Sequence, residues 1–170
     1  KNGLDCHVDL GNNIVATFIE CGHMKFSLQV FNRLGTRTEY SWTYVIRGHI
    51  EKGDAFLAFS LLWKMEEDRV LPSKFVFVAV LKACAILKCV AKSRQVHLLI
   101  VKLGLESDYF IGNTFVDLYA KCRSILEAQS VFAKLPSRDT VAWTALICGY
   151  VGNGLSKEAL KCYEKMKREG

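Results

Sequence analysis

Small polar side chains recur beside aromatic or apolar ones at helical spacing in this chain. Tyr40 precedes Thr43 by three residues, and Phe110 precedes Asn113 by the same interval. Residues three and four apart share one face of a helix, so each pair would present a hydrogen-bonding group next to a ring. Such a surface can hold a planar ligand with a polar edge, because the ring stacks on its face while the amide or hydroxyl pairs with its edge. The alternative is that these are exposed or capping residues of a helical scaffold.

Residues that could catalyse a reaction or bind a metal are not arranged for either task. The sequence lacks the His-x-Glu and Pro-Cys-x2-Cys signature of zinc deaminases. Gly152-Asn153-Gly154 lacks the spacing and the Lys-Ser/Thr of a phosphate-binding loop. No carboxylate or nucleophile partner is evident for the histidines, namely His7, His23, His49 and His97. The sequence therefore predicts no catalytic residue, no metal site, no cofactor and no small-molecule substrate.

Composition is typical of a packed protein with an anionic partner. Hydrophobic residues make up 51% of the chain and there are only 2 prolines, which excludes disorder. The 23 basic and 17 acidic residues give a net charge of +6, which favours an anionic partner without naming one. The most apolar run, residues 75–87, contains Lys82 and is too short to cross a membrane. Two of the 7 cysteines, Cys21 and Cys122, lie in helix-like stretches and are predicted to be buried.

An internal repeat supplies the elements that must position these side chains. Residues 109–150 match residues 8–49 at an offset of 101, with Trp42-Thr43 answering Trp143-Thr144. Smaller units tile the chain as 8–38, 39–73, 74–108, 109–139 and 140–170, after a tail of a preceding unit at residues 1–7. Each unit divides into two amphipathic helical segments that must bury their apolar stripes against neighbouring units. This pattern predicts one continuous all-α array of helix–turn–helix repeats.

The repeated strings resemble pentatricopeptide repeats. They read GN-xxV-xxxxx-C, VF-xx-L-xx-R, SW-T-xx-I-x-G and G-xxxx-A-xxxxxx-M, and they cover the whole chain. Alternating lengths of 31 and 35 residues resemble the short, standard and long units of the PLS subclass of plant organelle proteins. By this resemblance, 8–38 and 109–139 are short units, 39–73 and 140–170 are standard units (the last truncated), and 74–108 is a long unit. The implied fold is a right-handed α-solenoid.

In that family the fifth and last residues of a unit, here called the reader positions, select an RNA base, and the second residue stacks on it. The resemblance therefore implies the following reader pairs: Asn12 with Thr38, Thr43 with Ser73, Val78 with Asp108, Asn113 with Asp139, and Thr144 with a partner beyond Gly170. It implies the following stacking residues: Asp9, Tyr40, Phe75, Phe110 and Val141. Candidate phosphate contacts are Arg47, Lys82 and Lys121. Val78 departs from the polar reader residue of the family pattern, and Asp9 places an acid where an apolar stacking residue is expected.

The resemblance implies sequence-specific binding of single-stranded RNA. The implied setting is a mitochondrion or chloroplast, where such proteins guide transcript processing such as C-to-U editing together with editing-factor proteins. A deaminase domain, if the process uses one, would lie outside this chain. The alternative function is a protein-interaction scaffold that uses the same groove; the basic residues among the candidate contacts favour RNA.

Overall fold

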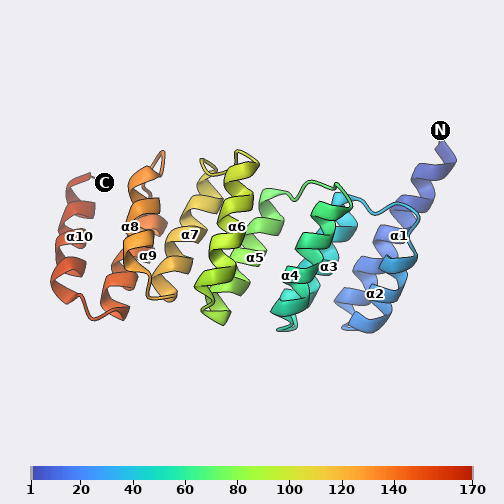
Figure 1. Ribbon diagram of the computed structural model, residues 1–170, viewed down its shortest axis with the longest axis horizontal. Coiled ribbons are helices and arrows are strands. Elements are labelled where there is room, and N and C mark those ends of the chain that lie inside the picture. The colour runs from blue at the N-terminus through green and yellow to red at the C-terminus, as the bar shows by residue number, and fades with distance from the viewer. Residues whose placement is uncertain (1, 170) are drawn as a thin grey trace. The chain divides into compact units, whose positions relative to one another are not determined.

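The computed structural model describes the backbone of residues 2–169 and the side chains of residues 8–169. These residues form ten α-helices and no strand (Figure 1). In chain order the helices are α1 (Asn2–Glu20), α2 (Met24–Arg33), α3 (Glu39–Glu51), α4 (Ala55–Glu67), α5 (Lys74–Leu87), α6 (Val90–Lys102), α7 (Tyr109–Lys121), α8 (Ile125–Lys134), α9 (Thr140–Gly152) and α10 (Ser156–Glu169). No helix among the described residues is long and apolar enough to cross a membrane.

The chain divides into two compact units, Lys1–Val80 and Leu81–Gly170. In the first, α1 packs against α2 and α3, and α3 packs against α4. In the second, α7 packs against α8 and α9, and α9 packs against α10. In each set the first odd-numbered helix, α1 or α7, therefore contacts both its own hairpin partner and the next odd-numbered helix, as expected for stacked helical repeats.

Helix starts are fixed by polar caps at the last residue of the predicted repeats. The Thr38 hydroxyl accepts the N–H of Ser41 at the start of α3, and the Asp139 carboxylate accepts the N–H of Ala142 at the start of α9. Asp108 accepts the N–H groups of Phe110 and Ile111 at the start of α7. Thr and Asp satisfy backbone donors that a helix leaves unpaired, so the chain enters each of these helices at a defined residue.

The first helix differs from the repeat tiling. The tiling predicts a boundary between residues 7 and 8, whereas α1 runs without a break from Asn2 to Glu20. Position 7 is a histidine, where the later units have Thr38, Ser73, Asp108 or Asp139. Histidine is a weak N-cap compared with these residues, so nothing in the local sequence stops the helix there.

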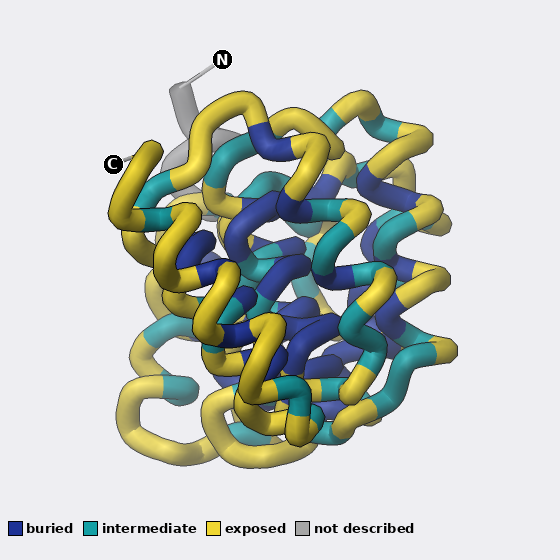
Figure 2. The backbone as a smooth tube through the Cα atoms, turned by 90° about the vertical axis from the view of Figure 1, so that its left-hand side faces the viewer, coloured by how far each residue is buried: buried dark blue, intermediate teal, exposed yellow. Residues whose placement is uncertain are grey.

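The core repeats from one unit to the other. Phe31 lies edge-on to Trp42 with ring centroids 4.6 Å apart, and Phe132 and Trp143 repeat the contact at 4.6 Å. Figure 2 shows the buried positions running along the helices, while most residues of the connecting turns are exposed or intermediate. Aromatic pairs of this geometry add about 0.5–1.5 kcal/mol beyond the burial of their area.

A repeated arginine closes the turn between neighbouring hairpins. The Arg37 guanidinium lies 5.3 Å from the Phe31 ring centroid and bonds Asp68 at 2.8 Å. The Arg138 guanidinium likewise lies 5.3 Å from the Phe132 ring centroid and is 3.6 Å from Glu169. The arginine in the string VF-xx-L-xx-R therefore joins the end of one hairpin to the second helix of the next.

Candidate functional site

Four large side chains at the second position of the predicted repeats project into solvent. The exposed fractions are 69% for Tyr40, 65% for Phe75, 57% for Phe110 and 62% for Val141. Asp9 occupies the same position in the first repeat and is also exposed. The three rings among them, Tyr40, Phe75 and Phe110, are open enough to stack on a flat ligand.

Asn113 and Asp139 are joined directly. The Asn113 amide nitrogen donates to Asp139 Oδ1 at 3.3 Å, and the same oxygen accepts the Ala142 N–H at 2.8 Å. A carboxylate only accepts hydrogen bonds, so it fixes the amide with its nitrogen toward Asp139 and its oxygen elsewhere. That oxygen, Asn113 Oδ1, is buried and has no hydrogen-bond partner among the described residues.

Asn12 and Thr38 form the equivalent pair but leave the amide less constrained. The Asn12 amide nitrogen donates to Thr38 Oγ1 at 3.1 Å, and Thr38 Oγ1 also lies 3.4 Å from Asn12 Oδ1. A hydroxyl can accept from the nitrogen or donate to the oxygen, so both orientations of the Asn12 amide keep a bond. The two pairs therefore share their place in the repeat and differ in how firmly they orient the amide.

The other predicted pairs are not joined in this way. Ser73 Oγ is buried and has no hydrogen-bond partner among the described residues, so no bond links it to Thr43, which is half-buried. Val78 lies half-buried in α5, and its predicted partner Asp108 is engaged in capping α7. The Thr144 hydroxyl donates to the Thr140 carbonyl at 2.6 Å and is exposed.

Burial of the two asparagines corrects one sequence-based expectation. The fifth position was expected on a face that the core does not use, yet Asn12 is only 7% exposed and Asn113 only 8%. Each side chain is covered because the capping residue of the next hairpin folds over it and bonds it. The fifth residue thus contributes to the packing as well as to the surface.

The candidate phosphate contacts are exposed and weakly paired. Arg47 lies 3.5 Å from Glu51, and Lys121 lies 2.7 Å from Asp117, both pairs four residues apart on one helix. Lys82 is exposed in α5. Exposed pairs of this kind contribute about 0–1 kcal/mol, so an incoming anion can replace the carboxylate at little cost.

Tyr109 makes a contact with Asp139 that the sequence did not predict. Its hydroxyl donates to Asp139 Oδ2, the carboxylate oxygen that Asn113 does not use. Its ring also meets the Phe110 ring edge-on, with centroids 5.4 Å apart. The first residue of the other units is Val8, Glu39, Lys74 or Thr140, so this tyrosine occurs only once and no repeat pattern pointed to it.

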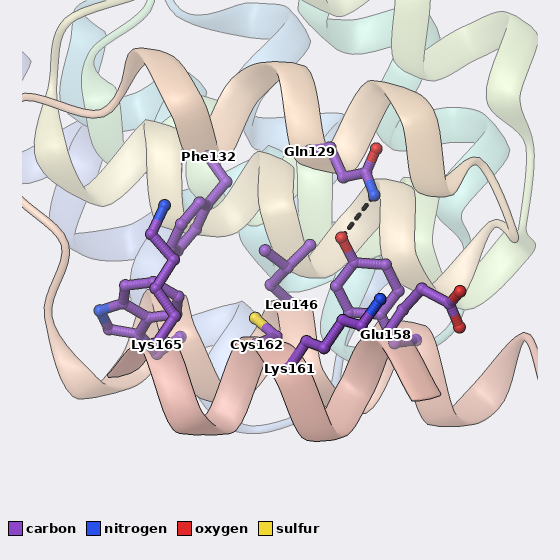
Figure 3. A pocket seen from close by; sticks show the side chains of 9 residues that line it. Gln129, Phe132, Leu146, Glu158, Lys161, Cys162 and Lys165 are labelled. Carbon is purple, nitrogen blue, oxygen red and sulfur yellow. Dashed lines mark hydrogen bonds between the residues drawn. The ribbon is translucent and has the colours of Figure 1, made fainter. Parts of the chain in front are cut away.

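A cavity of about 310 Å³ lies among α8, α9 and α10 (Figure 3). Phe132, Leu146 and Cys162 line it, and so do Glu158 and Lys161 of α10. None of the predicted reader or stacking residues lines it. The cavity therefore does not include the reader positions.

Burial makes two of the cysteines, Cys84 and Cys122, poor metal ligands and poor nucleophiles. Burial raises the pKa of Cys84 to about 12, and burial also raises the pKa of Cys122. Zinc binds the thiolate, which both residues disfavour at neutral pH. In the described part of the chain no three His, Cys, Asp or Glu residues could share a metal ion. Cys21 is exposed and Cys122 half-buried, contrary to the predicted burial, because both lie where the first helix of a hairpin ends.

Comparison with known proteins gives one consistent family. The family model described as PPR repeat matches residues 40–70 and 141–170. A pentatricopeptide repeat-containing protein of Arabidopsis thaliana is 31% identical over all 170 residues, which cover 20% of its length. Two further Arabidopsis proteins of that name are also similar over the whole chain. One is named chloroplastic (34% identical, 28% of its length) and one mitochondrial (33%, 27%). The chain thus spans between a fifth and a third of these relatives.

Solved structures show the same fold. The pentatricopeptide repeat protein PPR10, in complex with an 18-nt psaJ RNA element, matches 95% of this chain and 25% of its own with a TM-score of 0.78 at 20% identity. A structure of PPR10 from maize covers 100% of this chain and 27% of its own with a TM-score of 0.76 at 19% identity. The predicted fold class, an all-α solenoid of helix–turn–helix repeats, is confirmed by this likeness.

Proposed function

We infer that this chain, which belongs to the pentatricopeptide repeat family, binds single-stranded RNA through the second and fifth residues of its repeats. Exposed rings at the second position support stacking on bases, since every base has an aromatic face. The net charge of +6 supports binding to a polyanion. PPR10, whose fold the chain shares, is described as bound to an 18-nt RNA element.

The observation that carries the proposal is the unpaired oxygen of Asn113. Leaving a buried acceptor without a donor costs about 1–3 kcal/mol, so a base N–H that reached this oxygen would gain a favourable hydrogen bond. A base stacked on Phe110 would bring an N–H donor to that region. The second hydrogen of the Asn113 amide can donate to the same base, because Asp139 uses only one of them.

Amide orientation then determines which pyrimidine is preferred. Uracil offers an N–H next to a carbonyl oxygen, whereas cytosine offers a ring nitrogen acceptor next to an amino group, so the two need opposite orientations of an amide. Asp139 fixes the orientation of Asn113, which favours uracil at the fourth unit. Thr38 allows Asn12 either orientation, which favours either pyrimidine at the first unit.

The family pattern extends this reading to the other units. Thr43 with Ser73 is assigned to adenine, and Thr144 to a purine. Val78 assigns no base. Because repeats of this family run parallel to the RNA, the proposed site is 5′-Y-A-N-U-R-3′.

We further propose that the RNA is an organelle transcript and that binding guides its processing, with C-to-U editing as the specific case. Relatives named chloroplastic and mitochondrial support an organelle without deciding which one. The sequence of this chain holds no deaminase signature, so the chemistry would come from another segment or from an editing-factor protein. This chain would supply recognition.

Fluorescence anisotropy with single-stranded and duplex RNA of the same sequence tests the proposal. We expect tighter binding to the single strand, because paired and stacked bases cannot reach Phe110 or Asn113. Affinity should fall with salt, with a logarithmic slope of about −0.7 for each phosphate contacted. Equal affinity for duplex and single strand would exclude base reading, and absence of RNA binding would favour the protein-scaffold alternative.

A matched pair of variants locates the surface. Phe110→Ala should weaken single-strand binding by about 1–3 kcal/mol, the usual loss when an aromatic stacking partner is removed. Leu126→Ala is the control. Leu126 is also an exposed apolar residue, at 74%, but it lies on α8, which carries none of the reader or stacking residues. Equal losses in the two variants would count against the proposed surface.

A further inference from the structure

Asp139 is held by three donors from three different places in the chain. Oδ1 accepts from the Ala142 N–H of α9 and from the Asn113 amide of α7, and Oδ2 accepts from the Tyr109 hydroxyl at the first residue of α7. In the first unit, the capping residue Thr38 has one side-chain oxygen, and the residue at Tyr109's position is Val8, which has no hydroxyl. Of these two units, only the fourth therefore has the third donor.

The third donor determines the plane of the carboxylate. Rotation about the bond between Cβ and the carboxyl carbon of aspartate is soft, with a broad range of permitted angles. Ala142 holds one oxygen but leaves this rotation open, so Oδ1 could turn away from Asn113. The Tyr109 hydroxyl holds the other oxygen, and two fixed oxygens fix the plane. Oδ1 then stays directed at the Asn113 amide nitrogen.

We propose that Tyr109 is a positioning residue for base selection at the fourth unit: it holds the Asp139 carboxylate, which in turn holds the Asn113 amide in the orientation that accepts uracil and rejects cytosine. This inference rests on the proposed RNA-binding function. Tyr109 itself reads no base. Its ring supports Phe110 from the edge, so one side chain connects the stacking residue to the edge-reading pair.

Replacing Tyr109 by phenylalanine separates its two contacts. Tyr109→Phe keeps the ring against Phe110 and removes only the hydroxyl. Competition binding is measured for the whole chain with RNAs that carry U, C or an abasic sugar at the fourth position of 5′-Y-A-N-U-R-3′. We expect the preference for U over C to fall by roughly three- to tenfold, as for the loss of one ordinary hydrogen bond. Binding to the abasic RNA should be unchanged.

Tyr150→Phe is the matched control. The Tyr150 hydroxyl is also hydrogen-bonded in the same compact unit, to the Gln129 amide, but it lies away from Asp139 and lines the cavity of Figure 3. This variant should keep the preference of the parent chain for U. Tyr109→Val, which copies the first unit, should lose the preference and also bind U and C more weakly, because Phe110 loses its edge contact.

The outcomes separate this inference from the function on which it rests. A parent chain that prefers U and a Tyr109→Phe variant that prefers it equally would overturn the role of Tyr109 and leave RNA binding intact. An equal loss in Tyr150→Phe would also overturn it, since the effect would then be general. A parent chain that binds no RNA, or that shows no preference at the fourth base, would overturn the proposed function itself.

Discussion

Asn113 is both packed and left with a buried acceptor that has no hydrogen-bond partner among the described residues. Asn113→Thr should therefore change stability as well as specificity. The shorter side chain loses the bond to Asp139 inside a site that is 8% exposed, and we expect a loss of about 1–2 kcal/mol in the free energy of unfolding. The family pattern assigns Thr with Asp to guanine, so the preferred fourth base should change from U to G.

Competition binding with RNAs that differ only at the fourth base measures the change in specificity, and thermal unfolding measures the change in stability. Asn12→Thr is the control: it makes the same replacement at an equally buried position and should leave the fourth base preference alone. A retained preference for U in Asn113→Thr would show that Asn113 does not read the base.

For single residues, the sequence predicted which positions are equivalent better than it predicted their burial. The offset of 101 placed Asn12 and Asn113 at equivalent positions, and each of them does bond the capping residue predicted as its partner. Their burial could not be predicted, because the covering residue belongs to the next hairpin. Tyr109 could not be predicted either, because a contact that occurs in one unit leaves no periodic signal.

At the scale of helices, a glycine sets how closely α7 and α9 approach. A Cβ added to Gly149 would lie 2.6 Å from the Ala120 Cβ, which is attached to the backbone and cannot turn aside. The equivalent Gly48 has Ile19 Cγ2 at 2.6 Å, so the close approach recurs in the first compact unit. The glycine in the string SW-T-xx-I-x-G is therefore a packing requirement.

Gly149→Ala and Gly152→Ala test this requirement within a single helix. Gly149→Ala should lower the free energy of unfolding by about 1–3 kcal/mol, because separating two packed helices outweighs the gain in helix propensity. Gly152 lies at the end of α9 with no atom within 4 Å of an added Cβ, so Gly152→Ala should be neutral or stabilising by up to about 1 kcal/mol. Chemical denaturation measures both, and a stabilised Gly149→Ala would contradict the proposed close packing.

Helix boundaries show where local signals suffice and where they do not. α3, α5, α7 and α9 begin at the first residue of a predicted repeat, and in α3, α7 and α9 the preceding Thr or Asp caps the helix. α1 passes its predicted boundary because His7 offers no comparable stop. The repeat lengths of 31 and 35 residues can be read from the sequence. The start of the first helix cannot, because no capping residue marks it.

For the whole molecule, each of the two compact units contains a histidine whose lowered pKa makes stability depend on pH. Burial lowers the pKa of His49 in the first unit and of His97 in the second below the ordinary value of 6.5. Asp54, 3.7 Å from the His49 ring, opposes the shift, while Lys134 adds to it at His97. The His97 ring also shares a 3.0 Å hydrogen bond with the Tyr119 hydroxyl and stacks near Phe115.

These lowered pKa values fix the sign of the effect on stability. The unfolded chain takes up protons on both histidines as the pH falls through about 6.5, whereas the folded chain takes them up only at lower pH. The unfolded state therefore binds more protons in this window, and stability is lost as the pH falls below about 6.5. Above that value both rings are neutral in the folded and the unfolded state, so the two histidines contribute no dependence of stability on pH.

Thermal unfolding between pH about 7.5 and about 5.5 tests this expectation. The midpoint of the parent chain should fall over this range, and His97→Gln and His49→Gln should each reduce the fall, because each removes one proton uptake that favours unfolding. His23→Gln is the control, since the His23 ring is exposed. A midpoint that stays constant in the parent chain, or a fall that His23→Gln reduces as much as the other two, would contradict the assignment to the buried rings.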